Sequence, residues 1–199
     1  MRLNGVFLVM LTMLTGCATQ PVQAPSPLAN QAQYQAHLAK LATISQFNLK
    51  GRLSANTQKQ GFSGSVMWQH QPATDEIAIY SPLGGQVAAI RHDETGVTLV
   101  DTKGNSVTAN DAETLTEQTM GWRLPLAGLT DWALGRPSAS SAVESASWDE
   151  AGRLTKLKQS GWEIEYLNYQ DKQDHALPGK IFMRSEQVNL KLLVEDWKL

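Results

Sequence analysis

Residues 47–54 read FNLKGRLS, and apolar or small residues alternate there with polar ones. The residues on the apolar side are Phe47, Leu49, Gly51 and Leu53. A period of two is typical of a β-strand with one buried face and one solvated face. The same alternation returns in residues 62–69 and 188–195. These stretches predict an antiparallel sheet that buries one of its faces.

Shorter apolar runs on either side of these stretches extend the predicted sheet. Most of them are bounded by Gly, Pro, Asn or Asp, which favour turns. Further strands are expected over residues 77–80, 86–92, 97–101, 105–109, 143–148, 153–159, 162–169 and 180–184. Turns are expected at residues 82–85, 94–96 and 103–104.

A helix is expected in front of the first strand, over residues 30–45. Asn30 is a favourable N-cap, and the apolar residues that follow it fall on one helical face. These apolar residues are Tyr34, Leu38, Leu41 and Ala42.

Two more helices are expected between the two groups of strands. Asn110 can cap the first of them, with Glu113 three residues later, and this helix runs to about Met120. Pro125 can occupy the first turn of the second, and Gly135 is its expected stop.

Together these elements predict an α+β fold. About eleven antiparallel strands form an open, half-closed barrel, and the helices cover its concave apolar face. Gly51, Gly61 and Gly64 are candidate bend points in the strands.

The N-terminus resembles a lipoprotein signal peptide. Residues 6–14 form an apolar run behind Arg2 that is far shorter than the about 20 residues of a membrane-spanning helix. The run ends in Leu14-Thr15-Gly16-Cys17, the pattern of a lipobox. The thiol of Cys17 would then carry diacylglycerol, and its amine, freed by cleavage, would carry a third acyl chain. The alternative is an ordinary signal peptide followed by an unrelated cysteine.

The chain therefore divides into three expected parts. Residues 1–16 are a signal peptide that is removed, and residues 17–29 are the lipidated cysteine and a flexible tether. The tether contains Pro21, Pro25 and Pro27. Residues 30–199 form a single domain.

Composition excludes several classes of function. Cys17 is the only cysteine in 199 residues, so the domain contains no disulfide. The formal net charge is −2 and no basic block is present, which argues against nucleic acid as a partner. No later apolar run has the length of a membrane span, so an anchored protein is expected. Ala18 stands where an Asp marks inner-membrane retention in enteric-type sorting, which favours the outer membrane.

Residues suited to catalysis are few and poorly placed. Residues 61–65 read GFSGS, but the glycines do not match G-x-S-x-G and the stretch lies in an expected strand. The four histidines are not spaced as metal ligands: His37, His70, His92 and His175. Asp75/Glu76 and Glu163/Glu165 are carboxylate pairs, and Glu163 and Glu165 share one strand face, which is more typical of a solvated face than of an acid–base dyad. We expect no enzyme, no metal site and no cofactor beyond the acyl groups of Cys17.

A set of short motifs, taken in order, resembles the LolB family of outer-membrane lipoprotein receptors. The motifs are the lipobox, Gly51-Arg52-Leu53, Gly64 with Trp68, Ser81-Pro82-Leu83-Gly84, Gly121-Trp122-Arg123-Leu124-Pro125, Trp132 with Gly135 and Pro137, Gly152-Arg153-Leu154, Gly161-Trp162 with Ile164, Tyr166 and Tyr169, Leu177-Pro178, and Trp197. Each motif is weak alone, but their ordered combination covers the whole expected domain.

The resemblance implies a function in lipoprotein localisation. It implies a receptor that is anchored in the outer membrane, faces the periplasm and accepts lipoproteins from the periplasmic carrier LolA. Acyl chains of the cargo would enter an apolar cavity in a half-barrel of eleven strands and pass into outer-membrane lipid. We expect a monomer. The family also projects an exposed leucine from a loop, which corresponds here to Leu83 between Pro82 and Gly84. Gly85 adds a second glycine that departs from the family pattern.

The expected cavity would be lined by apolar residues of the sheet and of the central helices. The candidates are Leu53, Val66, Trp68, Ile79, Leu115, Trp122, Leu129, Trp132, Ile164 and Tyr166. For the tryptophans, packing in the core is the alternative role.

Three other functions stay open at this point. The chain could be a lipid- or glycolipid-binding lipoprotein without a carrier partner. It could be a structural lipoprotein that scaffolds an outer-membrane assembly complex. It could also be an envelope hydrolase with a site that the motifs do not reveal.

Overall fold

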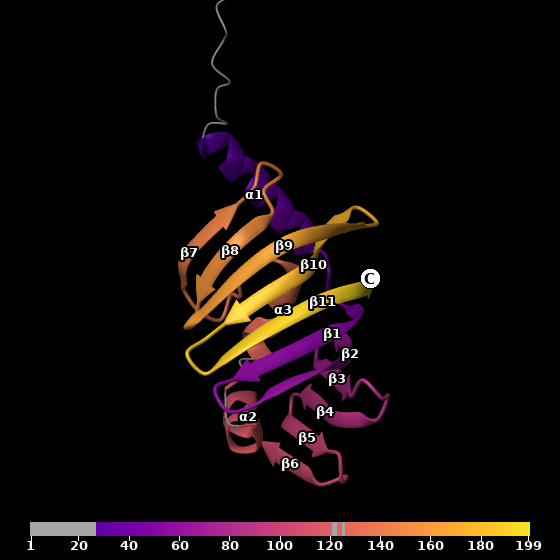
Figure 1. Cartoon of the computed structure of the whole chain (residues 1–199). Coiled ribbons are helices and arrows are strands. Elements are labelled where there is room, and N and C mark those ends of the chain that lie inside the picture. Colours follow the sequence, from indigo (N-terminus) through magenta and orange to yellow (C-terminus); the bar gives the residue numbers. More distant parts are fainter. Residues whose placement is uncertain (1–26, 121–122, 125) are drawn as a thin grey trace, which may run out of the picture.

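An eleven-stranded antiparallel sheet is the frame of the molecule (Figure 1). The computed structural model describes residues 27–120, 123–124 and 126–199. The strands are β1 (Phe47–Thr57), β2 (Gly61–Gln71), β3 (Thr74–Tyr80), β4 (Gln86–Asp93), β5 (Gly96–Asp101), β6 (Ser106–Ala109), β7 (Val143–Trp148), β8 (Leu154–Gln159), β9 (Trp162–Lys172), β10 (His175–Arg184) and β11 (Val188–Lys198). All the predicted strands are present.

The sheet is open. Its strand order is β6-β5-β4-β3-β2-β1-β11-β10-β9-β8-β7, so the first and last strands of the chain pair in the middle. The edge strands β6 and β7 do not pair with each other. Every strand pair is antiparallel, as the short turns between sequential strands require. This confirms the predicted half-closed barrel.

Two of the three candidate bend points lie where strands approach closely. The pairing of β1 with β11 shifts register between Lys50 and Gly51. A Cβ on Gly51 would collide with the carbonyl oxygen of Leu193, and one on Gly64 with the carbonyl oxygen of Tyr80. Glycine therefore permits the close contact between strands that curves the sheet. Gly61 begins β2 beside the turn instead.

The described residues also form three helices: α1 (Pro27–Leu41), α2 (Ala112–Met120) and α3 (Leu126–Leu134). In Figure 1, α3 lies behind β10 and β11, and α2 lies near the end of β1. α2 packs against β5 and β6, and α3 packs against β10. The helices thus cover the apolar face of the curved sheet, as predicted.

The ends of the helices differ in part from the prediction. α1 begins at Pro27, so Asn30 lies within the helix and is not its N-cap. It ends at Leu41 rather than Ser45, so Ala42 lies in the following turn and is exposed. The cap of α2 is Asp111 and not Asn110: its carboxylate accepts from the backbone N–H of Thr114 at 2.7 Å. Asp111 is a favourable cap because its charged oxygen stabilises the free N–H groups at the start of a helix. Gly135, with φ of +81°, ends α3 as expected.

Candidate functional site

A cavity of about 340 Å³ lies on the concave face of the sheet, beneath the central helices. Its lining comprises Leu49, Leu53, Ala55, Gln60, Phe62, Val66, Trp68, Ile77, Ile79, Val87, Ala88, Ile90, Thr119, Leu124, Leu129, Met183, Leu190 and Leu192. All of these except Gln60 and Thr119 are apolar, and none is charged. Such a cavity offers few partners to a polar ligand and favours hydrocarbon.

The period of two in the strands builds this lining. In β1 and β2 the inward positions are Leu49, Leu53, Val66 and Trp68, while the residues between them face outward. Small residues such as Ala55 and Ala88 leave space that larger side chains would fill. Thr119 of α2 and Leu129 of α3 close the cavity from the helical side.

The structure divides the predicted cavity residues into three groups. Leu53, Val66, Trp68, Ile79 and Leu129 line the cavity. Leu115, Trp132, Ile164 and Tyr166 do not line it and lie instead in the packed core. Trp122 lies outside the described residues.

Hydrogen bonds explain why two of the four core residues are held away from the cavity. The indole N–H of Trp132 donates to Oε1 of the buried Gln159 at 2.8 Å. The hydroxyl of Tyr166 donates to the backbone carbonyl of Trp132 at 3.0 Å. Trp162 packs against Trp132 with ring centroids 6.2 Å apart. These rings are buried in the core and pack between α3 and the sheet.

A polar cluster at the edge of the cavity was not predicted. The indole N–H of Trp68 donates to Oδ1 of Asp75 at 2.8 Å, and Nδ1 of His70 lies 2.8 Å from the same oxygen. Nδ1 of His92 lies 3.6 Å from the other carboxylate oxygen. The signal was present in the hairpins, because Asp75 is opposite His70 in one strand pair and His92 in the next.

The environment of Asp75 shifts its pKa in opposing ways. Burial raises the pKa, while hydrogen bonds from His70 and Trp68 lower it and prevail, so the net shift is downward. The carboxylate therefore stays charged and fixes the Trp68 ring in the cavity wall. Among the described residues, no group of three or more His, Cys, Asp or Glu residues is arranged to hold a metal ion.

The predicted carboxylate pairs do not form dyads. Asp75 faces the interior, whereas Glu76 faces outward and binds Nη1 of Arg91 at 2.7 Å. Glu165 lies on the outer face with Lys156 at 3.9 Å. Ser63 lies on the exposed face of β2.

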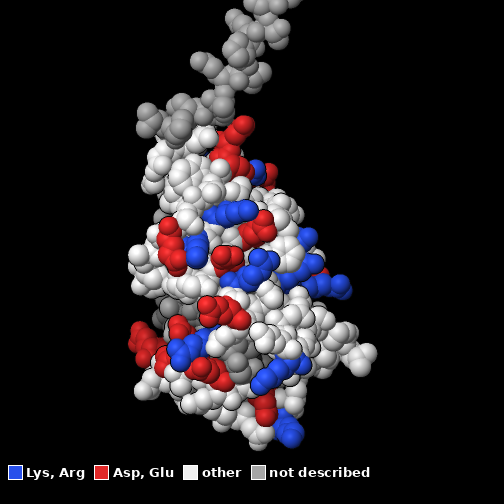
Figure 2. Space-filling model, turned by 60° about the vertical axis from the view of Figure 1, so that its left-hand side comes forward, with Lys and Arg blue, Asp and Glu red and all other residues white. Residues whose placement is uncertain are grey.

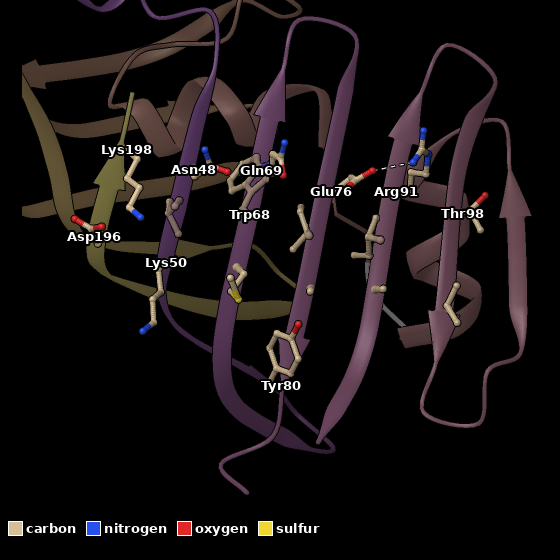
Figure 3. A pocket seen from close by; sticks show the side chains of 17 residues that line it. Asn48, Lys50, Trp68, Gln69, Glu76, Tyr80, Arg91, Thr98, Asp196 and Lys198 are labelled. Atoms are coloured by element: carbon tan, nitrogen blue, oxygen red, sulfur yellow. Dashed lines mark hydrogen bonds and ion pairs between the residues drawn. The ribbon is translucent and has the colours of Figure 1, made fainter. Parts of the chain in front are cut away.

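A larger hollow of about 720 Å³ lies on the outer face of the same strands (Figure 3). Charged residues of both signs line it, namely Lys50, Glu76, Arg91, Asp196 and Lys198. Figure 3 shows Glu76 and Arg91 toward one end and Lys198 with Asp196 toward the other. Burying these charges against hydrocarbon would be costly, so the smaller inner cavity is the better candidate for acyl chains.

The loop between β3 and β4 projects from the sheet. The backbone N–H of Ser81 donates to the carbonyl of Gly85 at 2.8 Å, and that of Gly84 donates to the carbonyl of Ser81 at 2.9 Å. Gly84 has φ of +88°, a conformation that glycine adopts without strain. Leu83 at the tip is 98% exposed and does not pack against the core.

The predicted lipid attachment site, Cys17, lies outside the described residues, as do the signal peptide and most of the tether. Within the described part of the chain, no helix combines the length and apolar character needed to cross a membrane.

Curated relatives resemble the chain over nearly its whole length. It is 36% identical over 196 residues to the outer-membrane lipoprotein LolB of Nitrosococcus oceani, which covers 98% of this chain and 96% of the relative. It is 32% identical over 199 residues to the protein of the same name from Azoarcus sp., and this match covers 100% of this chain and 99% of the relative.

Solved structures resemble the fold. A LolA superfamily protein from Nitrosomonas europaea matches with a TM-score of 0.55 and 11% identity, over 83% of this chain and 93% of that one. A DUF1329 family protein from Desulfovibrio piger matches with a TM-score of 0.52 and 5% identity, over 85% and 92%. These likenesses show the fold alone.

The family assignment combines these comparisons with the fold. The family model described as "Outer membrane lipoprotein LolB" matches residues 45–197. This range contains both central helices and all eleven strands, except for the last residue of β11. The identities of the relatives extend over the same region and beyond it. This chain therefore belongs to the LolB family of outer-membrane lipoproteins.

Proposed function

We propose that this protein is a receptor at the outer membrane that accepts lipoproteins from a LolA-type periplasmic carrier. It holds their acyl chains in the concave cavity and then inserts them into the outer membrane. The uncharged apolar lining of that cavity carries the proposal. The function consists of binding and transfer, and it needs no catalytic residue.

The physics of acyl chains explains the need for such a cavity. Three chains of about 15 methylenes each, at about 0.8 kcal/mol per methylene, correspond to roughly 36 kcal/mol of exposure to water. A lipoprotein therefore has to pass from one apolar site to another. Transfer runs downhill when the receptor binds more tightly than the carrier and the bilayer more tightly than the receptor.

The size of the cavity implies that the helices move when cargo binds. A volume of about 340 Å³ is at the lower end of the roughly 300–1,000 Å³ of ligand pockets. Thr119 and Leu129 belong to the two helices that cover it. We expect α2 and α3 to separate from the sheet as acyl chains enter, while the strands keep their pairing.

Two features outside the cavity complete the proposal. Acyl groups on Cys17 would hold the receptor at its destination and raise the local concentration of membrane. Leu83 would enter the bilayer during release, since a fully exposed leucine at a loop tip gains about 1.5–3 kcal/mol on burial.

Transfer of a fluorescently labelled lipoprotein from its LolA-type carrier to this protein tests the proposal. We expect the label to move to this protein in solution without an energy source and then to move to added vesicles. If acyl chains bind but none arrive from the carrier, the protein is a lipid-binding lipoprotein without a carrier partner. If it takes up no acyl chain at all, the cavity has no role in transport and the proposal fails.

A further inference from the structure

A second, chemically different hollow adjoins the Leu83 loop on the outer face of the sheet. It has a volume of about 360 Å³ and is lined by Arg52, Leu53, Ser54, Ser63, Gly64, Ser65, Pro82, Lys191 and Leu193. This lining combines two cations and three serine hydroxyls with no carboxylate. Pro82 belongs to the loop itself, so the hollow and the loop are continuous.

Strand register places these groups in two adjoining rows that lead to the loop. One row runs across the sheet through Lys180, Leu193, Arg52, Ser65 and Tyr80. The neighbouring row runs through Phe182, Lys191, Ser54 and Ser63. Since neighbouring strands lie about 4.8 Å apart, the backbones of Lys191 and Ser63, two strands apart in one row, are about 10 Å from each other. The loop begins directly after Tyr80.

The basic side chains remain available to a ligand. Arg52 is 72% exposed, and its ion pair with Glu195 is long, at 3.5 Å. Nζ of Lys191 and Nζ of Lys180 lie 5.5 Å and 5.4 Å from the centre of the Phe182 ring, which holds both ammonium groups on this face. Leu193 lies between Lys180 and Arg52 in the first row, is 38% exposed and adds an apolar surface.

Other outer surfaces differ from this one. The large hollow of Figure 3 and the one over β8 to β10 each contain both acidic and basic residues. On the face shown in Figure 2, Lys and Arg are likewise interspersed with Asp and Glu. A basic hollow whose lining contains no carboxylate, beside an exposed leucine, combines the features of a membrane contact, because basic groups meet headgroups while the leucine meets acyl chains.

We propose that this hollow binds the phosphate of a phospholipid headgroup while Leu83 is in the bilayer. The inference rests on the proposed function and assigns the headgroup contact of the same release step. The guanidinium of Arg52 can donate two parallel hydrogen bonds to phosphate oxygens, and Lys191 adds a point charge. The hydroxyls of Ser54 and Ser63 can donate to the remaining oxygens.

Vesicle co-sedimentation tests the contact with the mature chain carrying Cys17→Ser, which keeps every described residue but cannot be S-acylated. The probe is phosphatidylglycerol in phosphatidylcholine vesicles. The combined substitution Arg52→Gln and Lys191→Gln should weaken binding roughly 30-fold, because each basic residue at an anionic surface contributes about fivefold. Lys156→Gln with Lys158→Gln, on the outer face of β8, removes the same charge and should change binding less than twofold.

Two further arms separate phosphate recognition from charge and from folding. Vesicles of galactolipid and oleate carry equal charge without phosphate and should bind the unsubstituted protein less tightly than the phospholipid vesicles do. Arg52→Lys with Lys191→Arg keeps both charges but moves the guanidinium away from position 52, so it should bind more tightly than the double Gln variant and less tightly than the unsubstituted protein. Equal binding to both kinds of vesicle, or equal loss in the Lys156/Lys158 control, would overturn the phosphate site.

The outcome is distinguishable from failure of the proposed function. If the unsubstituted protein delivers cargo while Arg52→Gln with Lys191→Gln binds vesicles normally, only the headgroup site is wrong. If that variant keeps vesicle binding but no longer receives cargo from the carrier, the hollow contacts the carrier and the inference is wrong. If inorganic phosphate binds to the hollow without any effect of Arg52 or Lys191 on vesicle binding, the site is for free phosphate.

Discussion

The concave face of this sheet has two regions with the same strand pattern and opposite packing. Beneath α3, the packed region is filled by Trp132, Trp162, Tyr166 and the buried Gln159. Over β1 to β4, the hollow region is lined mainly by aliphatic side chains, together with Phe62 and Trp68, and it leaves a cavity. In the packed region, hydrogen bonds of Gln159 and Tyr166 join the sheet to α3, whereas the indole of Trp68 in the hollow region bonds to Asp75 within the sheet.

This difference shows how one helix serves both regions. α3 contributes Trp132 to the packed region and Leu129, three residues earlier, to the hollow region. Residues three apart lie on neighbouring parts of a helix surface. The packed region therefore anchors the helix that covers the cavity. The residues that stabilise the fold and the residues that line the cavity are neighbours on α3.

The largest effect that would test this comparison is the loss of Trp132. Trp132→Ala should lower the free energy of unfolding by about 3–5 kcal/mol, because it opens a cavity and removes one of the two hydrogen bonds that Oε1 of Gln159 accepts. Leu129→Ala on the same helix should cost about 1 kcal/mol, because this side chain already borders empty space. Urea unfolding of both variants measures the difference, and equal costs would mean that the hollow region is packed like the core.

Enlarging an alanine in each region gives the next largest contrast. Ala133→Phe should destabilise the protein by about 1–3 kcal/mol, since Ala133 is fully enclosed in the core. Ala55→Phe should leave stability nearly unchanged and instead fill the cavity. The added ring would exclude about two methylenes of a cargo acyl chain from the cavity, at about 0.8 kcal/mol each. We therefore expect the affinity for cargo, and with it the amount accepted from the carrier, to fall about tenfold. Normal acceptance by a folded Ala55→Phe variant would place the acyl chains elsewhere.

Asp75 holds Trp68 and His70 in place by hydrogen bonds at the edge of the hollow region. Because its pKa in the folded protein lies below the ordinary value of 3.8, its contribution to stability is complete above about pH 4 and is lost as pH falls through the lowered value. Asp75→Asn should cost about 1–2 kcal/mol near neutral pH and flatten this acid dependence. The neighbouring Glu76→Gln, on the exposed outer face, should change stability by less than about 0.5 kcal/mol. Urea unfolding at a series of pH values compares the two, and parallel curves would show that the Trp68 contact does not depend on the charge of Asp75.

The smallest effect on stability is expected at the tip of the loop. Leu83→Glu should change the free energy of unfolding by less than about 0.5 kcal/mol, since the side chain touches nothing in the core. It should slow release of cargo into vesicles by about 10- to 100-fold, which corresponds to the 1.5–3 kcal/mol of one buried leucine. Leu167→Glu, an exposed leucine on β9, serves as the matched control. A core-like shift of the unfolding midpoint in Leu83→Glu would show that this leucine packs in the fold.

The strands, most turns and the family could be predicted because their signals are local. Alternation in FNLKGRLS depends only on neighbouring residues, and Gly135 ends a helix through its own backbone freedom. The helix boundaries were less accurate, since Asn110 and Asp111 are both good caps and Thr114 bonds to the second. The order of several short motifs along the chain was enough to indicate the family.

The sequence alone determined the alternation that builds the curved sheet, its open form and the leucine at the tip of the loop. Only the tertiary structure decided which apolar residues surround a cavity and which fill the core. Leu53 and Ile164 both occupy inward positions of strands, but Leu53 lines the cavity whereas Ile164 is buried in the packed core. Likewise, Asp75 meets His70 and His92 only after strand register has formed. Such pairings depend on the register between neighbouring strands, and the period of a single strand contains no information about it.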